Sequence, residues 1–139
     1  MGFTYKYPRP ALTVDAIVFN GQEQVLLIQR SSPPFEDLWA FPGGFVDEDE
    51  TVEKAVYREL QEETGITEVE LKQFYTFSEP NRDPRHRTVT VAFVGRTMAF
   101  QKPVAGDDAK NSRWFNLDEL PPMAFDHAGI LNKVLKSLK

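Results

Sequence analysis

The chain has 139 residues, of which 41% are hydrophobic and 27% are charged, and its formal net charge is −5 at pH 7. That length fits a single domain, residues 1–139, and the composition is typical of a folded globular protein rather than a disordered one. Because the chain has no cysteine, a disulfide framework, a thiolate zinc site and a cysteine nucleophile are excluded. The negative charge argues against bulk nucleic-acid binding, and no apolar run approaches the roughly 18 residues of a membrane span. We therefore expect a cytoplasmic protein without a membrane partner.

The first part of the chain predicts a β-hairpin followed by a glycine-rich corner. Residues 12–19 and 24–30 are rich in apolar and β-branched side chains, and the Asn-Gly pair between them is a strong turn signal. A Ser-Ser-Pro-Pro sequence then opens a loop that runs to residue 39. The sequence Phe-Pro-Gly-Gly at residues 41–44 favours a tight corner that leads into a short extended segment, residues 45–47.

The helical pattern is clearest over residues 51–64, which Gly65 ends as a C-terminal cap. The remaining predicted elements are strands over residues 68–77, 88–95 with an extension to residue 101, and 113–116, and a closing helix over residues 126–138. One central and one terminal helix among these strands imply an α/β fold, in which helices cover both faces of a mixed sheet.

The central helix carries acidic side chains on the side that should be buried. At 100° per residue, Val52, Val56 and Leu60 form the buried face. Glu59 and Glu63 fall on that same side, away from the solvent-facing residues. A buried carboxylate is costly unless it is paired or binds a metal. The pattern therefore favours a cation site over the alternative, a solvated acidic helix.

The acidic cluster has the chemistry of a magnesium site. Glu59, Glu62 and Glu63 offer hard oxygen ligands, which suit Mg²⁺, or Mn²⁺ as its substitute, rather than zinc. Since Mg²⁺ commonly bridges carboxylates to a substrate phosphate, a phosphorylated ligand is expected. Arg58 is adjacent and would relieve the repulsion among the carboxylates, while Glu50 is placed to fix Arg58 from the start of the helix.

The spacing of these residues resembles a complete Nudix box. Gly44 is followed by five residues and Glu50, and then by seven residues and the run Arg58-Glu59-Leu60-Gln61-Glu62-Glu63-Thr64-Gly65-Ile66. The resemblance implies the Nudix α/β/α sandwich, with the box as a loop–helix–loop that binds two or three divalent metals. It also implies hydrolysis of a nucleoside diphosphate linked to another moiety. Every fixed position of the box matches, which disfavours a non-catalytic member.

Roles within the box follow from the resemblance, position by position. Glu59 and Glu63 would be the principal metal ligands, and Glu62 would be a further or water-bridged ligand. Gly43 or Gly44 would offer a main-chain carbonyl to the metal. The catalytic set that the resemblance implies is Glu50, Arg58, Glu59, Glu62 and Glu63.

The segment 78–87, with the sequence Ser-Glu-Pro-Asn-Arg-Asp-Pro-Arg-His-Arg, resembles the loop of ADP-ribose pyrophosphatases in this family. That group usually has a glycine where this chain has His86. Arg82, Arg85 and Arg87 would form an anion clamp for a diphosphate or a terminal ribose. The alternative is a solvated basic loop that offsets the acidic helix.

Four further residues are weaker candidates. Arg30, at the end of a predicted strand beside the box, would reach a phosphate or cap the sheet. A general base would come from a box glutamate or from outside the box, from Glu79, Asp107 or Asp108. Each of the last three is otherwise an ordinary loop carboxylate.

Together these patterns predict a magnesium-dependent pyrophosphohydrolase acting on a small-molecule nucleoside diphosphate, ADP-ribose or a relative, to give AMP and a sugar phosphate. Two alternatives stay open: a Nudix hydrolase that sanitises nucleoside triphosphates, and a Nudix module that senses ADP-ribose without cleaving it. Sensors of that kind normally carry a DNA-binding domain, for which residues 117–139 are too short. The ADP-ribose group commonly pairs, so a homodimer is also expected.

Overall fold

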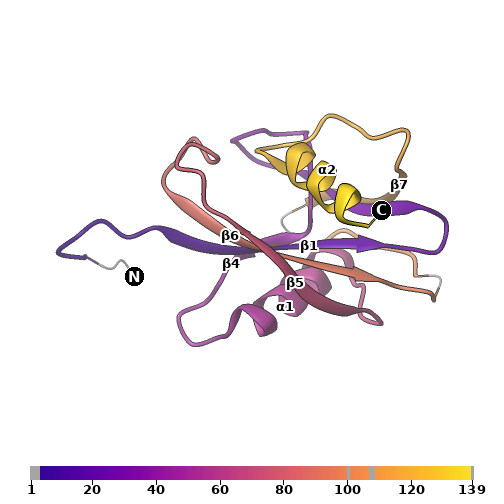
Figure 1. Cartoon of the computed structure of the whole chain (residues 1–139), viewed down its shortest axis with the longest axis horizontal. Helices are drawn as coiled ribbons and strands as arrows, with labels where there is room; N and C mark the ends of the chain where they lie inside the picture. The colour runs from indigo at the N-terminus through magenta and orange to yellow at the C-terminus, as the bar shows by residue number, and fades with distance from the viewer. Residues whose placement is uncertain (1–3, 100, 107–108, 139) are drawn as a thin grey trace.

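The computed structural model describes residues 4–99, 101–106 and 109–138. Its elements are β1 Ala11–Phe19, β2 Gln24–Arg30, β3 Trp39–Ala40, β4 Gly43–Phe45, α1 Val52–Thr64, β5 Glu70–Phe77, β6 Thr88–Arg96, β7 Ala109–Asn116 and α2 His127–Ser137. Strands β3-β2-β1-β6-β5 lie side by side in that order, with β4 paired to β1 and β7 paired to β2. The two helices lie on opposite sides of this sheet (Figure 1).

The predicted α/β fold with a mixed sheet is confirmed. Strand β1 runs parallel to β6 and antiparallel to β2 and β4. Its side chains alternate between two cores. Val14, Ala16 and Val18 pack with the buried face of α1, whereas Ile17 and Phe19 pack with α2. Because both faces of β1 are covered, nearly all of its residues are apolar.

The central helix forms as its termini predict. The Thr51 side chain accepts the backbone N–H of Lys54 at 3.1 Å, and Gly65 ends α1 in the left-handed conformation with φ 72°. Val56 and Leu60 are fully buried, as the periodicity predicts. Neither helix in the described residues is long and apolar enough to cross a bilayer.

Three predicted boundaries were wrong. The extended segment expected at residues 45–47 is β4, at Gly43–Phe45, because these residues pair with β1. Strand β6 ends at Arg96, so the described residues between 97 and 101 do not extend it. Strand β7 begins at Ala109, earlier than the predicted residue 113, because its pairing with β2 continues through a stretch of polar sequence.

Candidate active site

A pocket of about 390 Å³ lies where β1, β4, α1, the loop between β5 and β6, and the start of α2 meet. The site residues predicted from the sequence that line it are Arg30, Gly43, Gly44, Glu59, Glu63, Arg82 and Arg85. Segments far apart in the chain thus bring acidic and basic groups into one cavity.

Glu59 and Glu63 form the acidic side of the pocket. The Glu63 side chain is buried, and its Oε1 accepts the backbone N–H of Gly43 at 3.4 Å. Burial and the neighbouring Glu59 carboxylate raise the pKa of Glu63. Two adjacent carboxylates that are shielded from water require a proton or a cation between them. Their hard oxygen donors therefore fit a divalent metal such as Mg²⁺ or Mn²⁺.

Glu62 lies apart from this pair. Its side chain is 58% exposed and its Oε2 is 3.3 Å from Nη1 of Arg58, on the outer side of the helix. Accordingly, the described residues contain no group of three His, Cys, Asp or Glu side chains arranged to hold a metal. In this structure the pocket is lined by two of the three box glutamates predicted as metal ligands, and the third, Glu62, does not line it.

Arg58 connects the box helix to the loop before it. Its guanidinium donates two hydrogen bonds to Glu50, at 3.0 and 2.5 Å, and one to Glu59 Oε1 at 2.8 Å. A further hydrogen bond at 3.1 Å reaches the carbonyl oxygen of Phe45 in β4. These contacts lower the pKa of Glu50 to about 2 and keep Arg58 charged. The contact between Arg58 and Glu50 that the spacing predicts is present, and it fixes the orientation of the Glu59 carboxylate.

Both glycines of the corner lie where a side chain would not fit. A Cβ at Gly43 would come 2.1 Å from the carbonyl oxygen of Val14, and a Cβ at Gly44 would come 2.7 Å from Cδ of Glu59. The backbone of β4 can therefore approach the acidic pair closely because these two positions carry no side chain.

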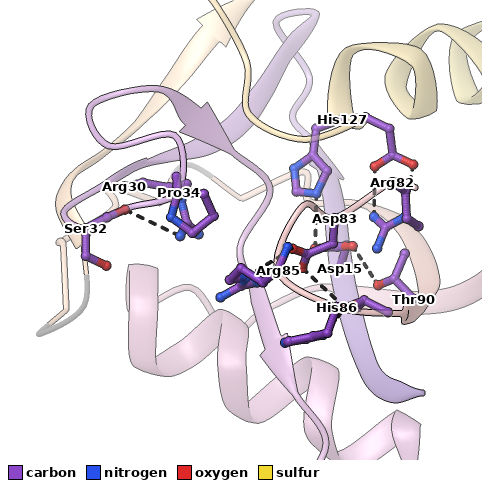
Figure 2. A network of polar contacts seen from close by, with 12 residues as sticks. Asp15, Arg30, Ser32, Pro34, Arg82, Asp83, Arg85, His86, Thr90 and His127 are labelled. Carbon is purple, nitrogen blue, oxygen red and sulfur yellow. Dashed lines mark hydrogen bonds and ion pairs between the residues drawn. The ribbon is translucent and has the colours of Figure 1, made fainter. Parts of the chain in front are cut away.

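The loop arginines do not form the predicted three-arginine clamp. Arg82 is buried in a bidentate ion pair with Asp126, at 2.8 and 3.0 Å (Figure 2). Arg85 is bound bidentately by Asp83, whose pKa falls to about 2 because hydrogen bonds from Arg85 outweigh the opposing effect of burial. Arg87 lies outside the pocket lining and donates to a carbonyl of its own loop.

Arg30 is the pocket arginine held by neutral partners. Its Nε donates to the carbonyl oxygen of Pro34 at 2.7 Å (Figure 2), and its guanidinium lies 4.9 Å from the ring centre of Phe125. The Arg85 guanidinium lies 5.6 Å from the same ring. Burial and the nearby Arg85 lower the pKa of Arg30. Since none of the ion pairs in the described parts of the chain involves Arg30, its charge is available to an anion.

Of the three bases predicted outside the box, the structure describes Glu79. Glu79 is exposed and does not line the cavity. Asp107 and Asp108 lie outside the described residues.

The pocket is also lined by residues that the sequence did not single out, among them Asp15, Phe125 and His127. Asp15 carried a usable signal, because it is the one charged residue in the apolar strand β1 and yet it is buried. His127 falls at helical spacing from Ile130 and Val134 on the buried side of α2. Phe125 carried no signal, since only the tertiary packing brings it to Arg30 and Arg85.

Comparison with known proteins places the chain in a well-defined group. A family model described as the NUDIX domain matches residues 9–136. A protein of Methanocaldococcus jannaschii named ADP-ribose pyrophosphatase is 40% identical, over 94% of this chain and 76% of its own length. A protein of Acinetobacter baylyi named ADPR responsive transcriptional repressor NtrR is 37% identical over 95% of this chain, which spans just over half, 56%, of that relative. The chain also superposes on a solved structure, the NUDIX domain of Shewanella oneidensis NrtR complexed with ADP ribose, with a TM-score of 0.90 at 34% identity. This match covers 96% of this chain and 91% of that one.

Proposed function

The chain belongs to the Nudix family, and from that premise we propose that it hydrolyses the diphosphate bond of ADP-ribose, or of a related nucleoside diphosphate derivative, to AMP and a sugar phosphate in a metal-dependent reaction. The observation that carries the proposal is the composition of one pocket. Its acidic pair, Glu59 and Glu63, suits divalent cations, while Arg30 suits the anionic part of the substrate. The relative named ADP-ribose pyrophosphatase supports this choice of substrate.

The acidic pair would hold the metal, and Arg58 would keep Glu59 turned toward it. When bound, divalent cations neutralise a diphosphate and lower the pKa of a coordinated water. Burial of Glu63 keeps competing water away from its carboxylate, which strengthens electrostatic contacts inside the pocket. Arg30, whose donors are not committed to a carboxylate, would bind an oxygen of the diphosphate.

A box glutamate is the proposed general base. Besides the acidic pair, the described carboxylates that line the pocket are Asp15, Asp47 and Asp83. Asp83 is neutralised by its arginine partner, and Asp15 accepts a hydrogen bond from Thr90 at 2.7 Å. These contacts make Asp15 and Asp83 structural acceptors, and Asp47 is 64% exposed with its Oδ2 3.7 Å from Nη2 of Arg58. The box glutamates are therefore the acidic groups proposed to face the reacting phosphate.

The test is turnover over a panel of substrates with Mg²⁺ present. ADP-ribose, NADH, a diadenosine polyphosphate and an oxidised nucleoside triphosphate would be incubated with the protein, and the products separated by ion-exchange chromatography. We expect AMP from ADP-ribose at the highest kcat/KM. Release of pyrophosphate from the triphosphate, with ADP-ribose left intact, would instead support a sanitising hydrolase.

A second candidate is an ADP-ribose sensor that binds without cleavage. The similarity to the NrtR domain complexed with ADP ribose and to the ADPR-responsive repressor favours it. Calorimetry distinguishes the two functions, because a sensor gives a stable binding isotherm with ADP-ribose and Mg²⁺ whereas an enzyme gives AMP. The homodimer implied by the family resemblance is tested separately by light scattering.

A further inference from the structure

His127, the first residue of α2, is a buried imidazole that the proposed reaction does not use. Its Nδ1 accepts the backbone N–H of Phe41 at 3.1 Å, and its ring stacks on the Phe41 ring with centroids 4.7 Å apart and an interplanar angle of 23°. Its other nitrogen, Nε2, lies 3.7 Å from Oδ1 of Asp15. Figure 2 shows the imidazole directed from α2 toward Asp15 on β1.

These contacts define the protonation state of the ring. Because Nδ1 accepts a hydrogen bond from a backbone amide, the ring proton resides on Nε2, which faces Asp15. Burial lowers the pKa of His127, so the neutral form is favoured. Asp15 is held in turn, since its Oδ2 accepts the hydroxyl of Thr90 at 2.7 Å. The imidazole is thus held by the hydrogen bond from Phe41 and by stacking on its ring, and a buried carboxylate lies 3.7 Å from its other nitrogen.

The amide that His127 binds begins the backbone segment that faces the acidic pair. Phe41 is followed by Pro42, whose carbonyl oxygen accepts the backbone N–H of Ala16 at 2.8 Å. Gly43 then pairs with β1 and donates its N–H to Glu63. A shift of the Phe41 amide would therefore move the glycine backbone relative to the carboxylates.

We infer that His127, which lies beside Asp15, is a positioning residue. Through the Phe41 amide it sets the backbone of residues 41–44 against Glu59 and Glu63, and so sets the geometry in which this pair binds a divalent cation. The inference rests on the proposed function, because that function requires the cation. By this inference the start of α2 lines the pocket and also positions the backbone of residues 41–44.

Two substitutions separate positioning from packing. His127→Asn keeps an acceptor near the position of Nδ1, so the Phe41 amide stays bound, but it removes the ring and leaves space in the core. His127→Phe keeps the ring volume and the stacking on Phe41, but it leaves the amide without an acceptor. If His127 only packs, the His127→Phe variant should be closer to the native chain than His127→Asn in every measurement. If His127 positions the backbone, His127→Asn should bind the metal more tightly than His127→Phe.

The primary readout is Mn²⁺ affinity without substrate, measured by electron paramagnetic resonance on the full chain, together with the unfolding midpoint of each variant. We expect His127→Phe to weaken Mn²⁺ binding about 10- to 100-fold, the usual effect of losing an outer-shell partner, and His127→Asn to weaken it clearly less despite a lower Tm. With ADP-ribose, His127→Phe should lower kcat and leave KM nearly unchanged. Asp15→Asn, which keeps the side-chain shape, should shift Mn²⁺ affinity in the same direction.

Mn²⁺ affinities that follow the order of the Tm values would overturn the inference, as would a native chain that binds no Mn²⁺. A native chain that binds Mn²⁺, shows the expected order of variants and does not cleave ADP-ribose would overturn only the proposed function.

Discussion

Gly44→Ala is a direct test of the acidic pair, because the structure gives the displacement that it would cause. The new Cβ would lie 2.7 Å from Cδ of Glu59 and 2.8 Å from both of its carboxylate oxygens. An ordinary contact is 3.4 Å or more, so the carboxylate must move by at least 0.7 Å, the difference between the two distances. Gly44 is outside the left-handed region, so alanine adds no backbone strain.

The displaced group is the end of a flexible side chain, so the variant should fold. The stability cost is at most the loss of the contact between Arg58 and Glu59, about 1 kcal/mol for a partly exposed ion pair. Catalysis is more sensitive, because misplacing a catalytic group by about 1 Å can reduce the rate 10²-fold. We therefore expect kcat for ADP-ribose to fall roughly 10- to 100-fold, with more Mg²⁺ needed for half-maximal rate.

The matched control is Gly129→Ala in α2. Nothing lies within 4 Å of a Cβ at this exposed position, so kcat should be unchanged and stability should rise by up to about 1 kcal/mol. Steady-state kinetics over a series of Mg²⁺ concentrations, with thermal unfolding, would measure kcat, the Mg²⁺ dependence and the stability of both variants. Native kcat and native Mg²⁺ dependence in Gly44→Ala would refute the placement of Glu59 as a metal ligand.

Further outcomes test other parts of the site. A chelator should abolish turnover and Mg²⁺ or Mn²⁺ should restore it; unchanged turnover in excess chelator would contradict the metal site. Glu63→Gln should lower kcat by roughly 10²-fold or more. Lys54→Ala, on the exposed side of α1, should change kcat little. Equal effects of the two substitutions on kcat would show that the helix faces are misassigned. Arg30→Ala should raise KM about 10- to 150-fold, as expected for one charge-assisted hydrogen bond. Arg82→Ala should mainly lower the stability measured by chemical unfolding, by about 3 kcal/mol for a broken buried pair. The reverse pattern would place Arg82 at the substrate. The pKa of Asp83 falls from 3.8 to about 2 on folding, so its stabilising effect is complete above pH 3.8 and is lost as pH falls toward 2. Over this pH range the urea midpoint of Asp83→Asn should decrease less than that of the native chain. Equal decreases of the two midpoints would argue against the ion pair.

Local sequence determined the box helix and the cluster within it. Thr51 and Gly65 set the ends of α1 through hydrogen bonds and a left-handed cap, which depend on neighbouring residues alone. The turn of 100° per residue then placed Glu59 and Glu63 beside the buried face, and the eight-residue spacing brought Glu50 to Arg58. These features were predictable because each depends on a separation of a few residues along one element.

Which arginine is available to an anion depends on contacts between segments that are distant in the sequence. The sequence placed Arg82, Arg85 and Arg87 together in one loop, but ion pairing depends on where carboxylates from other segments lie. Asp126, 44 residues from Arg82 along the chain, neutralises that guanidinium in a bidentate ion pair.

Long-range packing also brought Asp15 and His127 together at the pocket, 112 residues apart. Asp15 is the one charged residue of β1, and His127 lies on the buried side of α2, but neither residue indicates a partner by itself. Burial makes an unpaired polar group costly, so the folded chain pairs these residues once β1 and α2 close over the same core. Sequence periodicity fixes which face of an element a residue occupies, whereas the partner it meets there depends on how the elements pack.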